Sequence, residues 1–130
     1  MYRLLFLYFF LIFRTVQGQE LPPLRNFTTQ DFGAENQNWA ISQSNRKLIY
    51  FANNSGLLEY NGADWRLFQS PNQTIIRSVM VAGQRIYTGC YREFGYWEKD
   101  RFGNLKYTSL SSEIETLLLE DEEFWNITVV

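Results

Sequence analysis

The chain has 130 residues, with 12 basic against 14 acidic side chains, no histidine and a single cysteine. This charge balance argues against a nucleic-acid surface in this portion, which would need a basic patch. The lack of histidine excludes a Ser-His-Asp triad and a histidine-ligated metal site, and one cysteine cannot form an internal disulfide. The fold must therefore depend on core packing, for which aromatic residues, 18% of the chain, supply large apolar surfaces.

Residues 1–18 have the composition of a secretion signal. Arg3 gives a positive start, residues 4–13 form the apolar run LLFLYFFLIF, and residues 16–18 offer small side chains at cleavage-site spacing. The alternative is an uncleaved membrane anchor. The apolar run is too short to cross roughly 30 Å of hydrocarbon, and Arg14 ends it. We expect cleavage after this segment and export of the remaining chain.

Residues 19–37 form a polar lead-in that contains Pro22-Pro23 and shows no helical period. Phe27 and Phe32 are isolated apolar anchors within it. In a ring of repeated sheets, such a lead-in can supply the strand that closes the circle.

Residues 38–70 predict a first unit of four short strands. Asn61-Gly62 predicts a two-residue hairpin between the third and fourth strands, because both residues tolerate positive φ. The expected strands are 38–43, 47–51, 56–60 and 64–68.

Residues 75–108 predict a second unit of the same kind. Alternating side chains over 76–81 are followed by a break at Ala82-Gly83-Gln84, and further β-favouring segments come after it at short spacing. Strands joined this tightly form antiparallel meanders, because parallel strands need long crossovers. The other expected strands of this unit are 85–89, 94–98 and 104–108.

The two units read as copies of one repeat. Ile49-Tyr50 aligns with Ile86-Tyr87, Gly56 with Gly95 and Ile41 with Val79, at offsets of about 37 to 39 residues. Repeats of about 40 residues with four strands each are typical of β-propeller blades. The alternative is two unrelated hairpins in a small barrel.

Residues 109–123 are expected to be a connector, and 124–130 the first strand of a third, truncated blade. Ile114, Leu117 and Leu118 have helical spacing, and the acidic run over 120–123 is interpreted as solvated rather than metal-binding. Rings need at least about four blades, so we expect the chain to be the N-terminal fragment of a longer all-β propeller, with seven blades in the full protein.

Four Asn-x-Ser/Thr sequons allow two interpretations. They are glycosylation signals of a secreted eukaryotic protein, or turn residues of a bacterial one. The second is preferred, because the last sequon falls in a predicted inner strand. The four asparagines are Asn26, Asn53, Asn72 and Asn126.

Catalysis and cofactors are not predicted for this portion. A glycosidase needs two placed carboxylates, and the candidates each have an ordinary surface role available. Cys90 has no histidine to activate it and is interpreted as a small buried residue. The carboxylate candidates are Glu59, Asp64, Glu93 and Glu98.

A binding role fits the pattern better. Trp39, Arg77 and Trp125 occupy matching places near the starts of the three predicted innermost strands, and Tyr91 and Arg92 lie in a connection between strands. Aromatic rings and arginine suit stacking on sugars and holding acidic groups. The alternative is that the tryptophans pack between blades as core.

The second unit resembles the repeat of two-component regulator propellers, through Ile86-Tyr-Thr-Gly89 and Phe94-Gly-Tyr-Trp97. More broadly, residues 26–126 resemble the opening of membrane-bound transcriptional regulators of the Bacteroidetes type, through NWAISQS, FANNSGLLEYNGADW, SPNQTIIRSV and FWNI. In the first unit, Phe51-Ala52-Asn53 replaces the Thr-Gly element of the repeat.

The resemblance implies a periplasmic sensor propeller followed by a triple-tyrosine domain, one membrane helix and a cytoplasmic helix-turn-helix, or a histidine kinase in hybrid relatives. We therefore expect an exported, ligand-sensing domain for signal transduction and transcription regulation, on the periplasmic side of the inner membrane. Its expected partners are a small molecule or glycan, the remaining blades and a second copy of the full-length protein. The alternative is a fragment of a secreted propeller lectin or polysaccharide-active enzyme.

Overall fold

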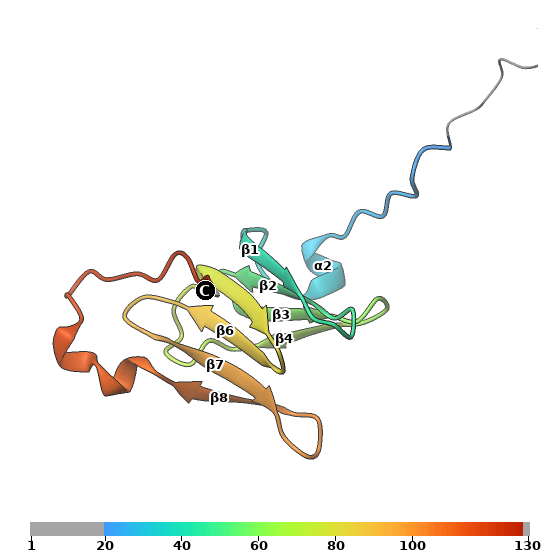
Figure 1. The fold of residues 1–130 in the computed structure, drawn as a ribbon. Coiled ribbons are helices and arrows are strands. Elements are labelled where there is room, and N and C mark those ends of the chain that lie inside the picture. Colours follow the sequence, from blue (N-terminus) through green and yellow to red (C-terminus); the bar gives the residue numbers. More distant parts are fainter. Residues whose placement is uncertain (1–19, 129–130) are drawn as a thin grey trace, which may run out of the picture.

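The computed structural model describes residues 20–128, so the predicted signal segment lies outside the described residues. The described chain is all-β apart from three short helical turns, and it forms two antiparallel sheets of four strands each, in the orders β1-β2-β3-β4 and β5-β6-β7-β8 (Figure 1). The first sheet contains β1 (Asn38–Gln43), β2 (Ile49–Asn53), β3 (Gly56–Tyr60) and β4 (Trp65–Phe68). The second contains β5 (Ser78–Ala82), β6 (Arg85–Gly89), β7 (Phe94–Lys99) and β8 (Leu105–Ser109).

The prediction of two units of four short strands each is confirmed, but two loops of the first sheet and the start of β5, at Ser78 instead of Ile76, differ from it. β2 begins at Ile49 instead of Lys47, because Lys47 has a φ of 63° and its N–H bonds to the Ser44 carbonyl in the preceding turn. The predicted two-residue hairpin at Asn61-Gly62 is wrong. Tyr60 pairs with Trp65, which leaves a four-residue loop in which the Asn61 side chain accepts the N–H groups of residues 63 and 64.

The core lies between the two sheets. β1 and β5 approach each other, and the Val81 N–H donates to Ser42 Oγ at 2.9 Å. Ile76 and Cys90, from loops flanking β5 and β6, complete the cluster and are fully buried. The strand residues of this core are Tyr50, Ala52 and Leu57 from the first sheet and Val79, Ile86 and Trp97 from the second.

The strand pairing corrects the alignment of the repeats by one residue. Tyr50 and Ile86 are the first buried residues of β2 and β6, and they pair with the buried Glu59 and Trp97 on β3 and β7. Tyr50 therefore corresponds to Ile86, whereas the sequence alignment placed it opposite Tyr87. Because side chains alternate between faces, Tyr87 lies on the opposite face, where its ring packs 5.9 Å from that of Tyr96.

The lead-in covers the far face of the first sheet. It contains a short helix that the sequence interpretation missed, α2 (Thr29–Phe32), whose first turn is fixed by hydrogen bonds from Thr28 N and Oγ1 to Asp31 at 2.6 and 2.8 Å. Phe27 packs against Tyr60 and Trp65 on β3 and β4, at ring distances of 5.2 and 5.1 Å. This packing buries apolar surface on the side of the sheet that faces away from the core.

Between β8 and residue 128 the helical segments are two 3-10 turns, η1 (Ser111–Glu113) and η2 (Glu115–Leu117). The strand predicted over 124–130 is not formed at residues 124–128. Glu123 makes one isolated bridge to Tyr91, and Phe124 crosses the end of the second sheet's outer face, where its ring lies 4.7 Å from that of Phe94. A strand needs a neighbour along its length, and this segment meets the sheet only at its end.

Candidate ligand-binding site

Arg77 packs against two tryptophan rings at the end of the sheets where β1 and β5 begin. Its guanidinium carbon is 4.4 Å from the ring centroid of Trp39 and 4.5 Å from that of Trp125. The two indoles meet edge to face, 5.5 Å apart. Three of the five residues predicted for binding are thus in mutual contact. We call these three residues the tryptophan–arginine cluster.

A β-bulge and a hydrogen-bond relay orient Trp39. The pairing of β1 with β2 shifts register between Asn38 and Ala40, so Trp39 is the extra residue of the bulge. Bulges re-aim side chains, and this one turns the indole toward Arg77. The Trp39 Nε1–H donates to Asn54 Oδ1 at 2.8 Å, and Asn54 Nδ2 donates to Glu35 Oε2 at 2.9 Å. Neither partner was expected from the sequence, because both contacts depend on loops that meet only in the fold.

Glu123 is the charged partner of Arg77, and it too was missed by the sequence interpretation. Its Oε2 is 3.4 Å from Arg77 Nε, and its Oε1 accepts a hydrogen bond from Arg77 Nη2 at 3.5 Å. The Arg77 side chain is only 15% exposed, and its Nε–H is buried without a hydrogen bond of acceptable geometry. The charge of Arg77 is therefore neutralised by a long, imperfect ion pair.

Hydrogen bonds to the Phe124 backbone fix the segment that carries Glu123 and Trp125. Phe124 N donates to the Cys90 carbonyl at 3.1 Å, and Ser78 Oγ donates to the Phe124 carbonyl at 2.7 Å. The close approach requires glycine at position 89, since a Cβ there would lie 2.5 Å from the Phe124 Cβ. The segment is therefore held against β5 and β6 before any ligand binds.

Tyr91 and Arg92 support this segment and do not belong to the tryptophan–arginine cluster. The Tyr91 hydroxyl donates to the Glu120 carbonyl, and Arg92 N donates to the Glu122 carbonyl at 2.8 Å. Arg92 has a φ of 51°, which marks a tight turn before β7, and its side chain lines a separate cavity of about 260 Å³. Their predicted role as ligand contacts remains a prediction.

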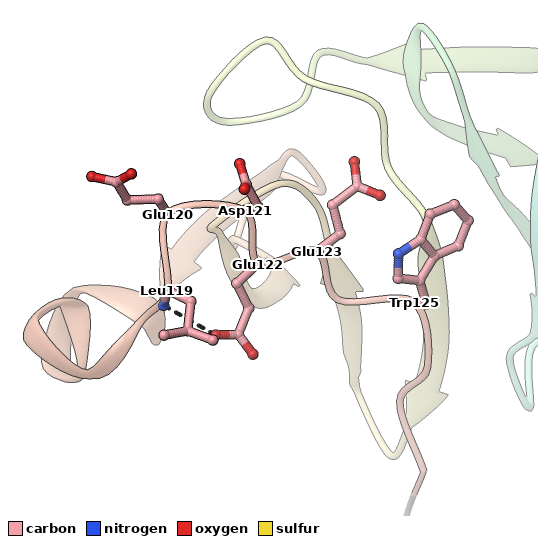
Figure 2. Close-up of a pocket in the computed structure, with 6 residues that line it drawn as sticks. All are labelled: Leu119, Glu120, Asp121, Glu122, Glu123 and Trp125. Carbon is pink, nitrogen blue, oxygen red and sulfur yellow. Dashed lines mark hydrogen bonds between the residues drawn. The ribbon is translucent and has the colours of Figure 1, made fainter.

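An open pocket of about 530 Å³ adjoins the tryptophan–arginine cluster at Trp125 (Figure 2). The carboxylates of Glu120, Asp121 and Glu123 lie on one side of the chain, and the Trp125 indole lies beside Glu123 at one end of the row. Glu122 turns away and accepts the Leu119 N–H at 3.2 Å. Trp39 and Trp125 are 41% and 47% exposed, so both indoles keep surface available to a ligand.

Three of the four carboxylates considered for catalysis, those of Glu59, Glu93 and Glu98, are engaged in separate contacts. Glu59 is buried between the sheets, where it accepts the Tyr50 hydroxyl at 2.8 Å and pairs with Lys99 Nζ at 3.0 Å. Glu93 accepts the Tyr107 hydroxyl at 2.7 Å.

Burial raises the pKa of the Cys90 thiol to about 12, which keeps it protonated and unreactive at neutral pH.

Two of the sequon asparagines have engaged side chains. Asn53 is fully buried, and its Nδ2 donates to the Glu35 carbonyl and to Asn38 Oδ1 at 2.7 and 2.9 Å. Asn72 Nδ2 donates to the Tyr91 carbonyl at 2.8 Å. In this fold, a glycan on Asn53 would have to break the contact between the lead-in and the β2–β3 loop.

Comparisons with family models, with curated proteins and with solved structures gave no match. Between residues 20 and 128, none of the helices has the length and hydropathy that crossing a membrane requires. Over the same range, histidine, cysteine and carboxylate side chains form no group of three or more that could hold a metal ion.

Proposed function

We propose that the two sheets are the first two blades of a β-propeller, seven-bladed in the full protein. Both sheets have the same strand order, and equivalent buried residues recur at an offset of about 36 to 38 residues, as with Tyr50 and Ile86. The sheets meet face to face, with β1 lying against β5. In a propeller the first strands of successive blades line the central channel, and this packing is consistent with that arrangement.

We further propose that the domain senses a ligand for a membrane-bound regulator of the kind it resembles. The tryptophan–arginine cluster, in which Arg77 packs against Trp39 and Trp125, carries this proposal. It lies where the starts of successive innermost strands converge, and loops at such an end are the usual place for binding residues. Two partly exposed indoles beside an open pocket suit a small molecule or glycan.

A secreted lectin or polysaccharide-active enzyme is the alternative. The observation that favours it is the row of carboxylates that lines the pocket together with Trp125, an arrangement that can also hydrogen-bond sugar hydroxyls. The two proposals differ in the part of the gene that they require beyond codon 130. Further blades, a triple-tyrosine domain, a membrane helix and a helix-turn-helix or kinase would support the sensor. A stop codon after the last blade would support the secreted protein.

The binding proposal is tested by calorimetric titration of the complete gene product against panels of soluble glycans and small metabolites. We expect at least one compound to bind, and Trp125→Ala to weaken it at least tenfold. Phe102→Ala is the matched control, because Phe102 is an aromatic residue that is 74% exposed in the β7–β8 loop. Equal affinities for the two variants would contradict the assignment of the site.

A further inference from the structure

We propose that the site takes a ligand with an oxyanion group, such as a carboxylate or sulfate, and that Glu123 is a built-in competitor that occupies the place of that group. The inference rests on the proposed ligand-sensing function and specifies its chemistry. It starts from the way Arg77 is presented. Two adjoining indoles contact its guanidinium, and its edge meets the Glu123 carboxylate.

The edge of Arg77 is incompletely satisfied by Glu123. Charge-assisted N–H···O⁻ bonds in proteins are about 2.7–2.9 Å long, and bidentate arginine–carboxylate pairs engage two N–H groups at once. Here the two contacts are 3.4 and 3.5 Å, and the Arg77 Nε–H is buried without a hydrogen bond. A free oxyanion can choose its own approach and form both bonds at normal length. Exchange of the intramolecular carboxylate for the ligand's oxyanion would therefore improve the hydrogen bonding.

The exchange needs only a side-chain movement. The backbone on either side of Glu123 stays held by the bonds from Arg92 N to the Glu122 carbonyl and from Phe124 N to the Cys90 carbonyl. The Glu123 side chain is 26% exposed and faces the open pocket beside Glu120 and Asp121 (Figure 2). The displaced carboxylate can turn into this pocket and become hydrated.

The neighbouring carboxylates oppose the exchange. Glu120 and Asp121 repel both the displaced Glu123 side chain and an arriving oxyanion. Both are exposed to solvent, and salt at physiological strength screens such charges beyond roughly 8 Å. The acidic residues should therefore lower the affinity for anions without abolishing it, and removing the Glu123 charge should raise it most.

The test uses the complete gene product, with sodium sulfate and sodium acetate as probes at constant ionic strength. Binding is followed by the tryptophan fluorescence of the tryptophan–arginine cluster. We expect saturable binding that Glu123→Gln tightens about fivefold, the upper range for a partly exposed ion pair. Glu120→Gln is the matched control, since it removes the same charge from the pocket without touching Arg77. Equal tightening by both variants, or no saturable binding by Glu123→Gln, would overturn the proposal.

Two further variants test Arg77 itself. Arg77→Met should abolish saturable anion binding, and circular dichroism checks that it is folded. Arg77→Lys keeps the charge but loses the planar pair of donors, so it should bind anions more weakly than the wild type even if the methionine variant does not fold. Unchanged binding by Arg77→Lys would refute the role of the guanidinium. If a compound found by calorimetry still depends on Trp125 while Glu123→Gln changes nothing, the binding proposal survives and the oxyanion inference fails.

Discussion

Replacement of Trp97 by alanine tests the packing between the two sheets. Trp97 is 5% exposed, its ring lies 5.0 Å from that of Tyr107 and 6.2 Å from that of Phe68 on the other sheet, and its Nε1–H donates to the buried Thr88 hydroxyl at 2.9 Å. Truncation removes nearly all of this buried surface and leaves a cavity. We therefore expect the free energy of unfolding to fall by about 3–5 kcal/mol.

The contribution of the hydrogen bond can be separated from that of packing. Trp97→Phe keeps most of the ring volume but leaves the Thr88 hydroxyl without its donor, which should cost about 1–3 kcal/mol. Thr88→Val in the Trp97→Phe background should recover part of that loss, because it removes the unsatisfied group. Trp125→Ala is the matched control, since this tryptophan is 47% exposed and should cost only about 1 kcal/mol.

The assay is urea denaturation of the complete gene product, followed by circular dichroism. A change near zero for Trp97→Ala would mean that its side chain faces solvent. Because side chains alternate along a strand, that result would place β7 one residue out of register and refute the assignment of the buried face.

The remaining predictions concern charge, reactivity and association. Lys99→Met should lower the free energy of unfolding by about 2 kcal/mol, because it leaves the buried Glu59 carboxylate without its nearest cation. Arg85→Met breaks an exposed ion pair in the same sheet, so it should lower the free energy of unfolding far less in the same denaturation assay. The Cys90 thiol should resist a thiol-reactive dye in the native state from pH 7 to 9, because its raised pKa of about 12 and its burial suppress the thiolate. Rapid labelling of Cys90 in this pH range would contradict its buried placement. Residues 20–130 expressed alone should form oligomers or aggregates, since the outer face of the second sheet presents half-buried Tyr87 and Tyr96. Size-exclusion chromatography with light scattering measures this, and a sharp monomer peak with cooperative melting would contradict the expectation.

Strand positions were largely predictable from the sequence, whereas loop geometry was not. Alternating β-favouring residues bounded by turn residues located Asn38–Gln43, Gly56–Tyr60 and Arg85–Gly89 at the bounds that the structure has. The loop at Asn61 differs, because its side chain bonds two subsequent N–H groups and stabilises a longer turn than the Asn-Gly pair alone suggests. The helix α2 was missed although Thr28 and Asp31 have the spacing of a capping box.

The one-residue error in aligning the repeats also has a physical cause. Alternation identifies a buried face only when the other face is solvated. In β3 the adjacent Leu57 and Leu58 are both fully buried, because the second sheet covers one face and the lead-in covers the other. A strand buried on both faces has no polar side in its sequence to fix which residues face the core.

The candidate site was predictable in part for a related reason. Trp39 and Arg77 lie near the starts of β1 and β5, and these strands approach each other. Trp125 joins them from the chain after β8. Asn54 and Glu123 contact them from loops far away in the sequence. Glu123 was grouped with the solvated acidic run, since nothing in the local sequence distinguishes it from the three acidic residues before it.

The central claim is that these two sheets are consecutive blades of a propeller, and an experimental structure of the complete gene product tests it most directly. We expect a third four-stranded antiparallel sheet that packs on the outer face of β5–β8 and covers Tyr87 and Tyr96, with Trp125 near the start of its first strand. An outer face left open to solvent, or covered by helices, would contradict the claim.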